Sequence, residues 1–355
     1  MAISIKLAVL FLLLFIPLIS RAKEQINISP DNPLIQYSGR IDFSDPQAPR
    51  FDWSGVSITV KFKGASIGFR LQDGKNNYEV KVDGRPATVW VTRLNQELYT
   101  LSGLSKKQHT VQLIKRTEPL YGIGIFKGLV LGEGCVLLEP PAKPARRIEF
   151  IGDSIVCGYG NESTTLKCGS LRPYENADKA FGPETARALK AEYVLVAYSG
   201  KGVVRNWGDK NRRSQEPFPA IYDRVLCGDP KNQWDYSKWI PDAVVIHLGS
   251  NDFSSEPRAE SKDYINGYIA LLKEVRGHYP DTSIFCFATT GWPNYSPFVE
   301  EVIKERHSAG DERVYFAGYP NFPVEDLGCD YHPQAKAHKK MAEILAPIMK
   351  NALDW

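Results

Sequence analysis

Residues 150–160 read FIGDSIVCGYG, and they decide how the second half of the chain is interpreted. A short apolar strand ends at Gly152, and Asp153 and Ser154 follow it directly. By itself a Gly-Asp-Ser triplet after a strand is usually a tight turn. The alternative is a reactive serine held at the mouth of an α/β sheet, and the rest of the sequence has to decide between the two.

The pattern around this stretch is that of a parallel sheet. Apolar strand runs alternate with helical stretches; the runs are RIEFIG, YVLVAYSG, AVVIHLGS, SIFCFATT and RVYFAG. Apolar spacing predicts helices over 263–279 and 341–348. Strands that are apolar on both faces are typical of a sheet covered by helices on both sides. We therefore expect a three-layer α/β/α domain over 148–355, with a parallel sheet of about five strands.

The first half of the chain has a different period. From about residue 30 to 135, apolar and polar or small residues alternate, as in Ile58, Val60 and Phe62. Turn signals such as Asp83-Gly84 separate the short runs, and no helical periodicity is present. This pattern predicts a β-sandwich of the jelly-roll kind over 23–138. The segment EPPAKPARR at 139–147, rich in proline, is the expected linker to the α/β domain.

Residues 1–22 have the features of a secretory signal peptide. Lys6 precedes the apolar run LAVLFLLLFIPLI, and Ser20-Arg21-Ala22 supplies small residues for cleavage. The run is short for a membrane span, although an uncleaved signal anchor is the alternative. Three N-x-[ST] sequons, at Asn27, Asn161 and Asn294, fit entry into a glycosylating compartment. We expect a secreted, extracellular protein that has no membrane contact after cleavage.

Charge and cysteine content exclude several functions. Without residues 1–22, 42 basic residues face 41 acidic ones, and no block of like charge is present, so binding to nucleic acid is not expected. The six cysteines form no CxxC pattern, and their pairing cannot be deduced from the sequence. Cys286 lies in an apolar strand and is expected to be a buried thiol. We expect a monomer without metal or organic cofactor.

Polar groups gather where the predicted strands end. These places are Gly152-Asp153-Ser154, Ser199-Gly200-Lys201-Gly202, Gly249-Ser250-Asn251-Asp252, Thr290-Gly291-Trp292 and, before the last helix, Asp330-Tyr331-His332-Pro333. The carboxyl ends of parallel strands meet at one rim. A serine, a histidine, an aspartate, an amide and glycine N–H groups are what acyl transfer needs. Each piece alone could be a turn, a helix cap or a surface residue, but together they favour a catalytic site.

At this point a family resemblance is evident. GDS, Gly200, GSND and the C-terminal Asp/His pair resemble the four blocks of the SGNH (GDSL) hydrolase superfamily. The longer stretches GDSIVCGYGN, SGKGVVRN and GCDYHP, together with the preceding jelly roll, resemble carbohydrate esterase family 2. The resemblance covers nearly all of the chain after residue 22. Each block alone is weak, but the set is specific.

The resemblance implies roles for individual residues. Ser154 matches the nucleophile and His332 the general base. The N–H groups of Ser154 and Gly200 and the amide of Asn251 match the donors to the oxyanion. Asp330 matches the acid that orients His332, with a departure: the superfamily spacing is Asp-x-x-His, and that position here is Cys329. In an extended loop Asp330 and His332 would point the same way, but a backbone carbonyl could orient the histidine instead.

The expected activity follows from these roles. We expect a secreted serine esterase that removes O-acetyl groups from a polysaccharide or oligosaccharide such as xylan, mannan or a glucan. Trp292 follows the fourth strand and could stack on a sugar ring, with Trp207 as a second platform. Alternatively, Trp292 is a core tryptophan under the loop. His247 lies in an apolar strand and is expected to be a hydrogen-bonded core residue rather than a ligand.

Other functions remain open or are disfavoured. A lipid esterase on the same fold is one alternative, and a carbohydrate-binding protein with a vestigial hydrolase domain is another. The jelly roll could bind glycan, or it could pack on the hydrolase domain and shape its cleft. The chain contains no G-x-S-x-G elbow, no P-loop and no H-E-x-x-H, which disfavours an α/β-hydrolase, a nucleotide-binding protein and a zinc protease.

Overall fold

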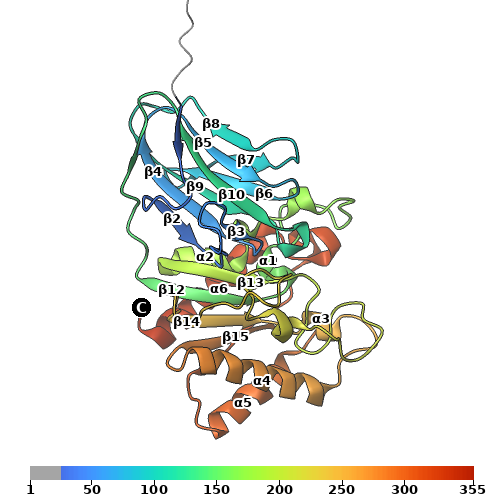
Figure 1. The fold of residues 1–355 in the computed structure, drawn as a ribbon. Coiled ribbons are helices and arrows are strands. Elements are labelled where there is room, and N and C mark those ends of the chain that lie inside the picture. Colours follow the sequence, from blue (N-terminus) through green and yellow to red (C-terminus); the bar gives the residue numbers. More distant parts are fainter. Residues whose placement is uncertain (1–24) are drawn as a thin grey trace, which may run out of the picture.

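The computed structural model describes residues 25–355, and Figure 1 shows a β-sandwich next to a layered α/β half. The expected signal peptide at 1–22 lies outside the described residues. One sandwich sheet has the order β1 (Ile26–Ile28), β10 (Gly124–Leu131), β5 (Ile67–Gln72), β8 (Leu98–Leu101), with β3 (Arg50–Phe51) paired to β10. The other has the order β11 (Val136–Leu138), β4 (Ser57–Lys63), β9 (Gln108–Lys115), β6 (Asn77–Val82), β7 (Arg85–Val91), with β2 (Ile35–Ser38) paired to β4.

The period-two pattern explains this half of the molecule. Ile58, Val60 and Phe62 of β4 are buried between the two antiparallel sheets. Asp83 and Gly84 join β6 to β7 with φ of 52° and 78°. Two successive positive φ values make the type I′ turn that matches the twist of a hairpin.

The second half contains one five-stranded parallel sheet. Its order is β13 (Ala191–Ala197), β12 (Arg146–Gly152), β14 (Ala243–His247), β15 (Ser283–Thr289), β16 (Val314–Tyr319). The helices α4 (Ser261–His278) and α5 (Ser296–Ser308) contribute to one apolar core, and α2 (Phe181–Leu189) and α6 (Ala335–Leu353) contribute to a second core. The predicted fold class is thereby confirmed, including both helices expected from apolar spacing.

The two halves are joined by residues 139–145, which form no helix or strand. β12 begins at Arg146, inside the expected linker 139–147, so the predicted domain borders stay a prediction. The sandwich packs directly on the α/β half. Arg40 is fully buried and lies 3.0 Å from the Glu149 carboxylate of β12. The indole N–H of Trp53 donates to the carbonyl of Val225 at 2.9 Å.

The carboxyl ends of the parallel strands build one rim. β12 runs into α1 (Ser154–Cys157), and β14 leads to α3 (Ser250–Phe253). The loop after β13 and the segment after β15 reach the same edge of the sheet. In open α/β sheets this edge is where ligands bind. Within residues 25–355 no helix is long and apolar enough to cross a membrane.

Candidate active site

Ser154 is the first residue of α1 and lies directly after β12. The Asp153 side chain accepts the N–H of Ile155 at 3.1 Å and so caps this short helix. A side chain at Gly152 would place its Cβ 2.3 Å from Val156 and 2.8 Å from the carbonyl oxygen of His247. Glycine is therefore required for the abrupt change from strand to helix that presents Ser154 at the rim.

His332 lies against Ser154. Its Nε2 is 2.8 Å from the Ser154 Oγ, and its Nδ1 is 3.1 Å and 3.2 Å from the carbonyl oxygens of Cys329 and Asp330. These carbonyls favour a proton on Nδ1, which leaves Nε2 as the acceptor for the serine hydroxyl. Burial lowers the pKa of His332 below its ordinary value, and the nearby Asp153 charge opposes this shift.

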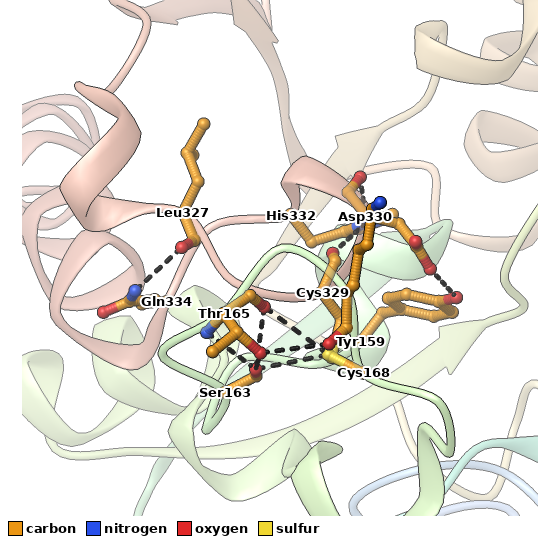
Figure 2. The surroundings of a disulfide bond; sticks show 10 residues. Tyr159, Ser163, Thr165, Cys168, Leu327, Cys329, Asp330, His332 and Gln334 are labelled. Atoms are coloured by element: carbon orange, nitrogen blue, oxygen red, sulfur yellow. Dashed lines mark hydrogen bonds between the residues drawn. A yellow bond between two sulfur atoms is a disulfide. The ribbon is translucent and has the colours of Figure 1, made fainter.

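Asp330 does not take the place expected for it. Its carboxylate accepts the Tyr159 hydroxyl at 2.8 Å rather than an imidazole N–H (Figure 2). The expectation of an extended loop is wrong because Asp330 and Tyr331 have φ of 49° and 62°, in the left-handed region. A left-handed pair turns the Asp330 side chain away from the imidazole. Of the two orienting groups left open by the sequence, the geometry corresponds to the backbone carbonyl.

The turn that carries His332 is held by the segment after Ser154. Cys329 forms a disulfide with Cys168, and the Cα atoms are 5.5 Å apart (Figure 2). The Asp330 N–H donates to the carbonyl of Leu166 at 2.8 Å. A Cβ at Gly160 would lie 2.3 Å from the Cβ of Cys329, so the backbone approaches the disulfide closely. These contacts fix the carbonyl of Cys329, which in turn faces the imidazole.

Asn251 and Gly200 lie on the other side of Ser154. Asn251 of α3 is 7% exposed, and its amide donates to the carbonyl of Lys201 at 2.8 Å and to Asp153 at 3.3 Å. Gly200 has a φ of 81°. Within residues 25–355 its N–H meets no hydrogen-bond acceptor. Gly200 is not among the residues that line the pocket at this rim. It adjoins Lys201, whose carbonyl accepts the amide N–H of Asn251.

The loop that contains Gly200 is anchored by Asp252, a residue to which the sequence pattern assigned no role. The fully buried Asp252 carboxylate accepts the N–H groups of Val203, Val204 and Arg205, each at 2.9 Å. Burial raises the pKa of Asp252 to about 6, and the three backbone donors oppose this shift. The sequence offered a signal for this role of Asp252: it is the last residue of GSND, which was predicted to lie at the same rim as the glycine-rich loop around Gly200.

The same rim contains a pocket of about 380 Å³, lined among others by Ser154, Asn251 and His332. Trp207 and Trp292 also line it, and both side chains are 65% exposed. Trp292 is therefore not a core residue, and the alternative raised for it is wrong.

Tyr331, 67% exposed, is a third aromatic residue of the pocket, which the sequence pattern did not identify. Its position directly before His332 in the sequence could have identified Tyr331 as a residue of the site.

Two further expectations concern buried groups. His247 is fully buried and its Nε2 lies 2.7 Å from the Tyr319 hydroxyl, so the prediction of a hydrogen-bonded core histidine is confirmed. Cys286 is a buried free thiol, as predicted. Within residues 25–355 no group of three or more histidine, cysteine or acidic residues is placed to hold a metal ion.

The disulfide yields a direct prediction. Protein unfolded without reductant should expose four thiols to a thiol reagent, and six after reduction, because four cysteines are free and one pair is bonded. Cys168→Ser should expose five and lower the free energy of unfolding by about 2–5 kcal/mol, since the bond closes a long loop. Cys135→Ser, which removes a free buried thiol of the sandwich, is the control. Six thiols without reductant would contradict the pairing.

Comparisons with known proteins agree with this architecture. The family model described as "Carbohydrate esterase 2 N-terminal" matches residues 37–141, and that of the "GDSL-like Lipase/Acylhydrolase family" matches residues 150–340. The matches correspond to the sandwich and to the α/β half with the Ser154–His332 pair.

Three relatives illustrate the similarity. The chain is 38% identical to the cellulase/esterase CelE of Acetivibrio thermocellus over 92% of its own length, but it spans only 40% of that protein. An acetylxylan esterase / glucomannan deacetylase of Cellvibrio japonicus is 28% identical, with 92% of this chain and 91% of that protein covered. The structure of a family two carbohydrate esterase from Clostridium thermocellum in complex with cellohexaose superposes with a TM-score of 0.85 at 35% identity, over 90% of this chain and 99% of that one. By these matches over both halves, the chain belongs to carbohydrate esterase family 2 and carries a GDSL-like acylhydrolase domain.

Proposed function

We propose that this carbohydrate esterase is a serine enzyme that removes O-acetyl groups from polysaccharides or oligosaccharides of the xylan, mannan or glucan type. The observation that carries the proposal is the 2.8 Å contact between Ser154 Oγ and His332 Nε2, in a pocket that Trp207 and Trp292 also line. A hydroxyl in contact with a neutral imidazole is the arrangement of an activated nucleophile.

The first half-reaction transfers the acetyl group to the enzyme. Ser154 Oγ attacks the acetyl carbonyl carbon while its proton moves to Nε2 of His332, and the carbonyl electron pair moves to the oxygen. When the tetrahedral intermediate collapses, the bond to the sugar oxygen breaks and His332 returns the proton to that oxygen. The products of this step are the free sugar hydroxyl and acetyl-Ser154.

The second half-reaction regenerates the enzyme. Water gives a proton to Nε2 of His332 and attacks the acetyl carbonyl, and the bond to Ser154 Oγ breaks as that oxygen takes the proton back. Acetate leaves. The carbonyl oxygens of Cys329 and Asp330 keep the Nδ1 proton in place through both steps, since their distances of 3.1 Å and 3.2 Å suit hydrogen bonds.

Three donors are proposed for the oxyanion that forms twice in this cycle. They are the N–H groups of Ser154 and Gly200 and the side-chain amide of Asn251. The support is their position. Ser154 begins a helix, and Gly200 has a free N–H within the described residues. The Asn251 amide is held by the Lys201 carbonyl at 2.8 Å, and its second N–H, in a longer 3.3 Å contact with Asp153, would turn to the oxyanion. Donors fixed before the reaction stabilise a developing charge more than mobile water does.

Aromatic residues at the rim support a sugar substrate. Trp207 and Trp292, with Tyr331 beside them, expose broad apolar faces that fit the apolar faces of sugar rings. The names of the relatives point to the same class, since one is an acetylxylan esterase / glucomannan deacetylase and another was solved with cellohexaose.

Secretion is part of the proposal. The signal-like residues 1–22 and the Cys168–Cys329 disulfide support it, because disulfides persist in oxidising compartments. The three sequons do not support secretion equally. Asn27 and Asn294 are exposed, but Asn161 is buried and its amide donates to the carbonyl of Asn176 at 2.9 Å, so the folded protein offers no glycosylation site there.

The first test is hydrolysis of p-nitrophenyl acetate, butyrate and octanoate by the chain from residue 23 onward. We expect the acetate ester to be cleaved fastest and the rate to fall steeply with acyl length. Ser154→Ala should abolish turnover, because it removes the nucleophile. Octanoate cleavage equal to acetate cleavage would favour the lipid-esterase alternative. An active Ser154→Ala variant would refute the mechanism, and an inactive wild type on every ester and acetylated glycan would favour a binding protein.

A second prediction concerns pH and Asp330. The value of kcat/KM should rise with pH as His332 loses its proton, with a midpoint below the ordinary histidine value because burial lowers its pKa. Asp330→Asn should lower this midpoint only slightly, because the Asp330 charge is the smallest of the contributions that raise the pKa of His332. It should hold kcat within about 10-fold, whereas loss of a triad aspartate costs about 10⁴-fold. The reason is that the Asp330 carboxylate binds Tyr159. A loss near 10⁴-fold would show that Asp330 does orient the base.

A third prediction separates sugar binding from chemistry. Trp292→Ala and Trp207→Ala should each raise KM for an acetylated oligosaccharide about 10-fold, which corresponds to about 1.4 kcal/mol. Both variants should cleave p-nitrophenyl acetate like wild type, because that ester carries no sugar. Phe43→Ala, which removes an exposed aromatic side chain of the sandwich, is the matched control. Unchanged KM values would refute the role of the two tryptophans.

A further inference from the structure

Glu118 is a carboxylate of the sandwich that reaches into the α/β half. It follows β9 and precedes a 3₁₀ turn at Pro119–Tyr121. The side chain is fully buried, and its Oε2 accepts the backbone N–H of Ser199 at 2.8 Å. Ser199 directly precedes Gly200. A residue 81 positions earlier in the chain therefore binds the loop that carries a proposed oxyanion donor.

Glu118 is itself held from several sides. Its N–H donates to Oε1 of Glu175 at 2.6 Å, and its carbonyl accepts the buried Lys115 ammonium at 3.2 Å. Its Oε2 also lies 3.9 Å from the Sγ of Cys157, at the end of the helix that begins with Ser154. Glu118 thus contacts both segments that bear on the oxyanion: the loop before Gly200 and the helix of the nucleophile.

The loop from 199 to 205 is held by two carboxylates at opposite ends. Asp252 binds the N–H groups of 203–205 from within the α/β half. Glu118 binds the N–H of Ser199 from the sandwich. The direction of the Gly200 N–H depends on the peptide that joins Gly200 to Ser199. Gly200 has a left-handed φ and lies outside every helix and strand, so no regular hydrogen bonding fixes this peptide. A contact at Ser199 is therefore well placed to set that direction.

We propose that Glu118 is a positioning residue for the oxyanion site, so that the sandwich supplies part of the machinery of acyl transfer. The inference rests on the proposed function and deepens it. It also separates two roles left open for the sandwich, since a module that only binds glycan needs no contact with Ser199. The property that matters is reach and hydrogen-bond acceptance rather than charge. Burial raises the pKa of Glu118, in keeping with a group that need not be ionised.

The test compares variants that separate reach from charge. Glu118→Gln keeps the length of the side chain and an acceptor oxygen. Glu118→Asp keeps the carboxyl group but is one methylene shorter, and Glu118→Ala removes both the reach and the acceptor. The matched control is Asp52→Ala. Asp52 is another buried sandwich carboxylate that accepts a backbone N–H of the α/β half, that of Cys227 at 2.9 Å, outside the proposed oxyanion loop.

The substrate is p-nitrophenyl acetate, which has no sugar and so does not report glycan binding. We expect Glu118→Asp and Glu118→Ala to lower kcat by about 10- to 100-fold with KM within about 2-fold, a smaller loss than the deletion of a whole oxyanion donor. Glu118→Gln and Asp52→Ala should stay within about 3-fold of wild-type kcat. Thermal unfolding of each variant shows whether it folds. If Glu118→Ala does not fold, the comparison of the Asp and Gln variants decides the question.

Several outcomes would overturn the inference. The first is a wild-type kcat in Glu118→Asp. The second and third are a loss of kcat in Glu118→Gln, or in the Asp52→Ala control, as large as the loss in Glu118→Asp. The fourth is a change in KM without a change in kcat. If the wild type shows no activity that depends on Ser154, the proposed function fails and the inference fails with it. If the wild type is active and one of the four outcomes is seen, the inference alone fails.

Discussion

The hydrogen bond between Ser154 Oγ and His332 Nε2 joins two segments 178 residues apart, and the rest of the site is arranged to keep it. A serine hydroxyl donates to an imidazole only if the other ring nitrogen carries the proton, so the Nδ1 side must meet an acceptor. In this chain that acceptor is backbone. Backbone carbonyls are only as well placed as the turn that carries them, which explains why so many contacts converge on residues 328–332.

The two sides of Ser154 are held in different ways. On the histidine side, a disulfide and the Leu166 carbonyl fix a turn with two successive left-handed residues. On the opposite side, buried carboxylates bind the backbone of the loop around Gly200 through its N–H groups. The Asp252 carboxylate accepts three of these N–H groups and the Glu118 carboxylate one, so donors that would otherwise be unpaired are satisfied. On both sides, groups that take no part in the reaction therefore hold the residues that do.

The sequence was informative wherever a local pattern carries the structure. Strand and helix periods predicted the two halves, and the placement of Ser154, Asn251 and His332 at element boundaries predicted that they meet at one rim. Those patterns are set by burial over a few residues. The orientation of Asp330 was not predictable, because it depends on the φ of two residues in a turn closed by Cys168, far away in the chain. Likewise, the Glu118–Ser199 contact depends on how two domains pack.

The use of carbonyls in place of a carboxylate at Nδ1 has an electrostatic consequence. A carboxylate beside an imidazole stabilises the protonated ring by a full charge, whereas two carbonyl dipoles stabilise it less. Burial then outweighs both the Asp153 charge and the two carbonyls, which raise the pKa of His332, and that pKa falls below its ordinary value. The base is consequently neutral and able to accept a proton over a wider range toward acid pH. Its orientation depends on a covalently closed turn rather than on a charge, and so should change little with the ionic strength around the protein.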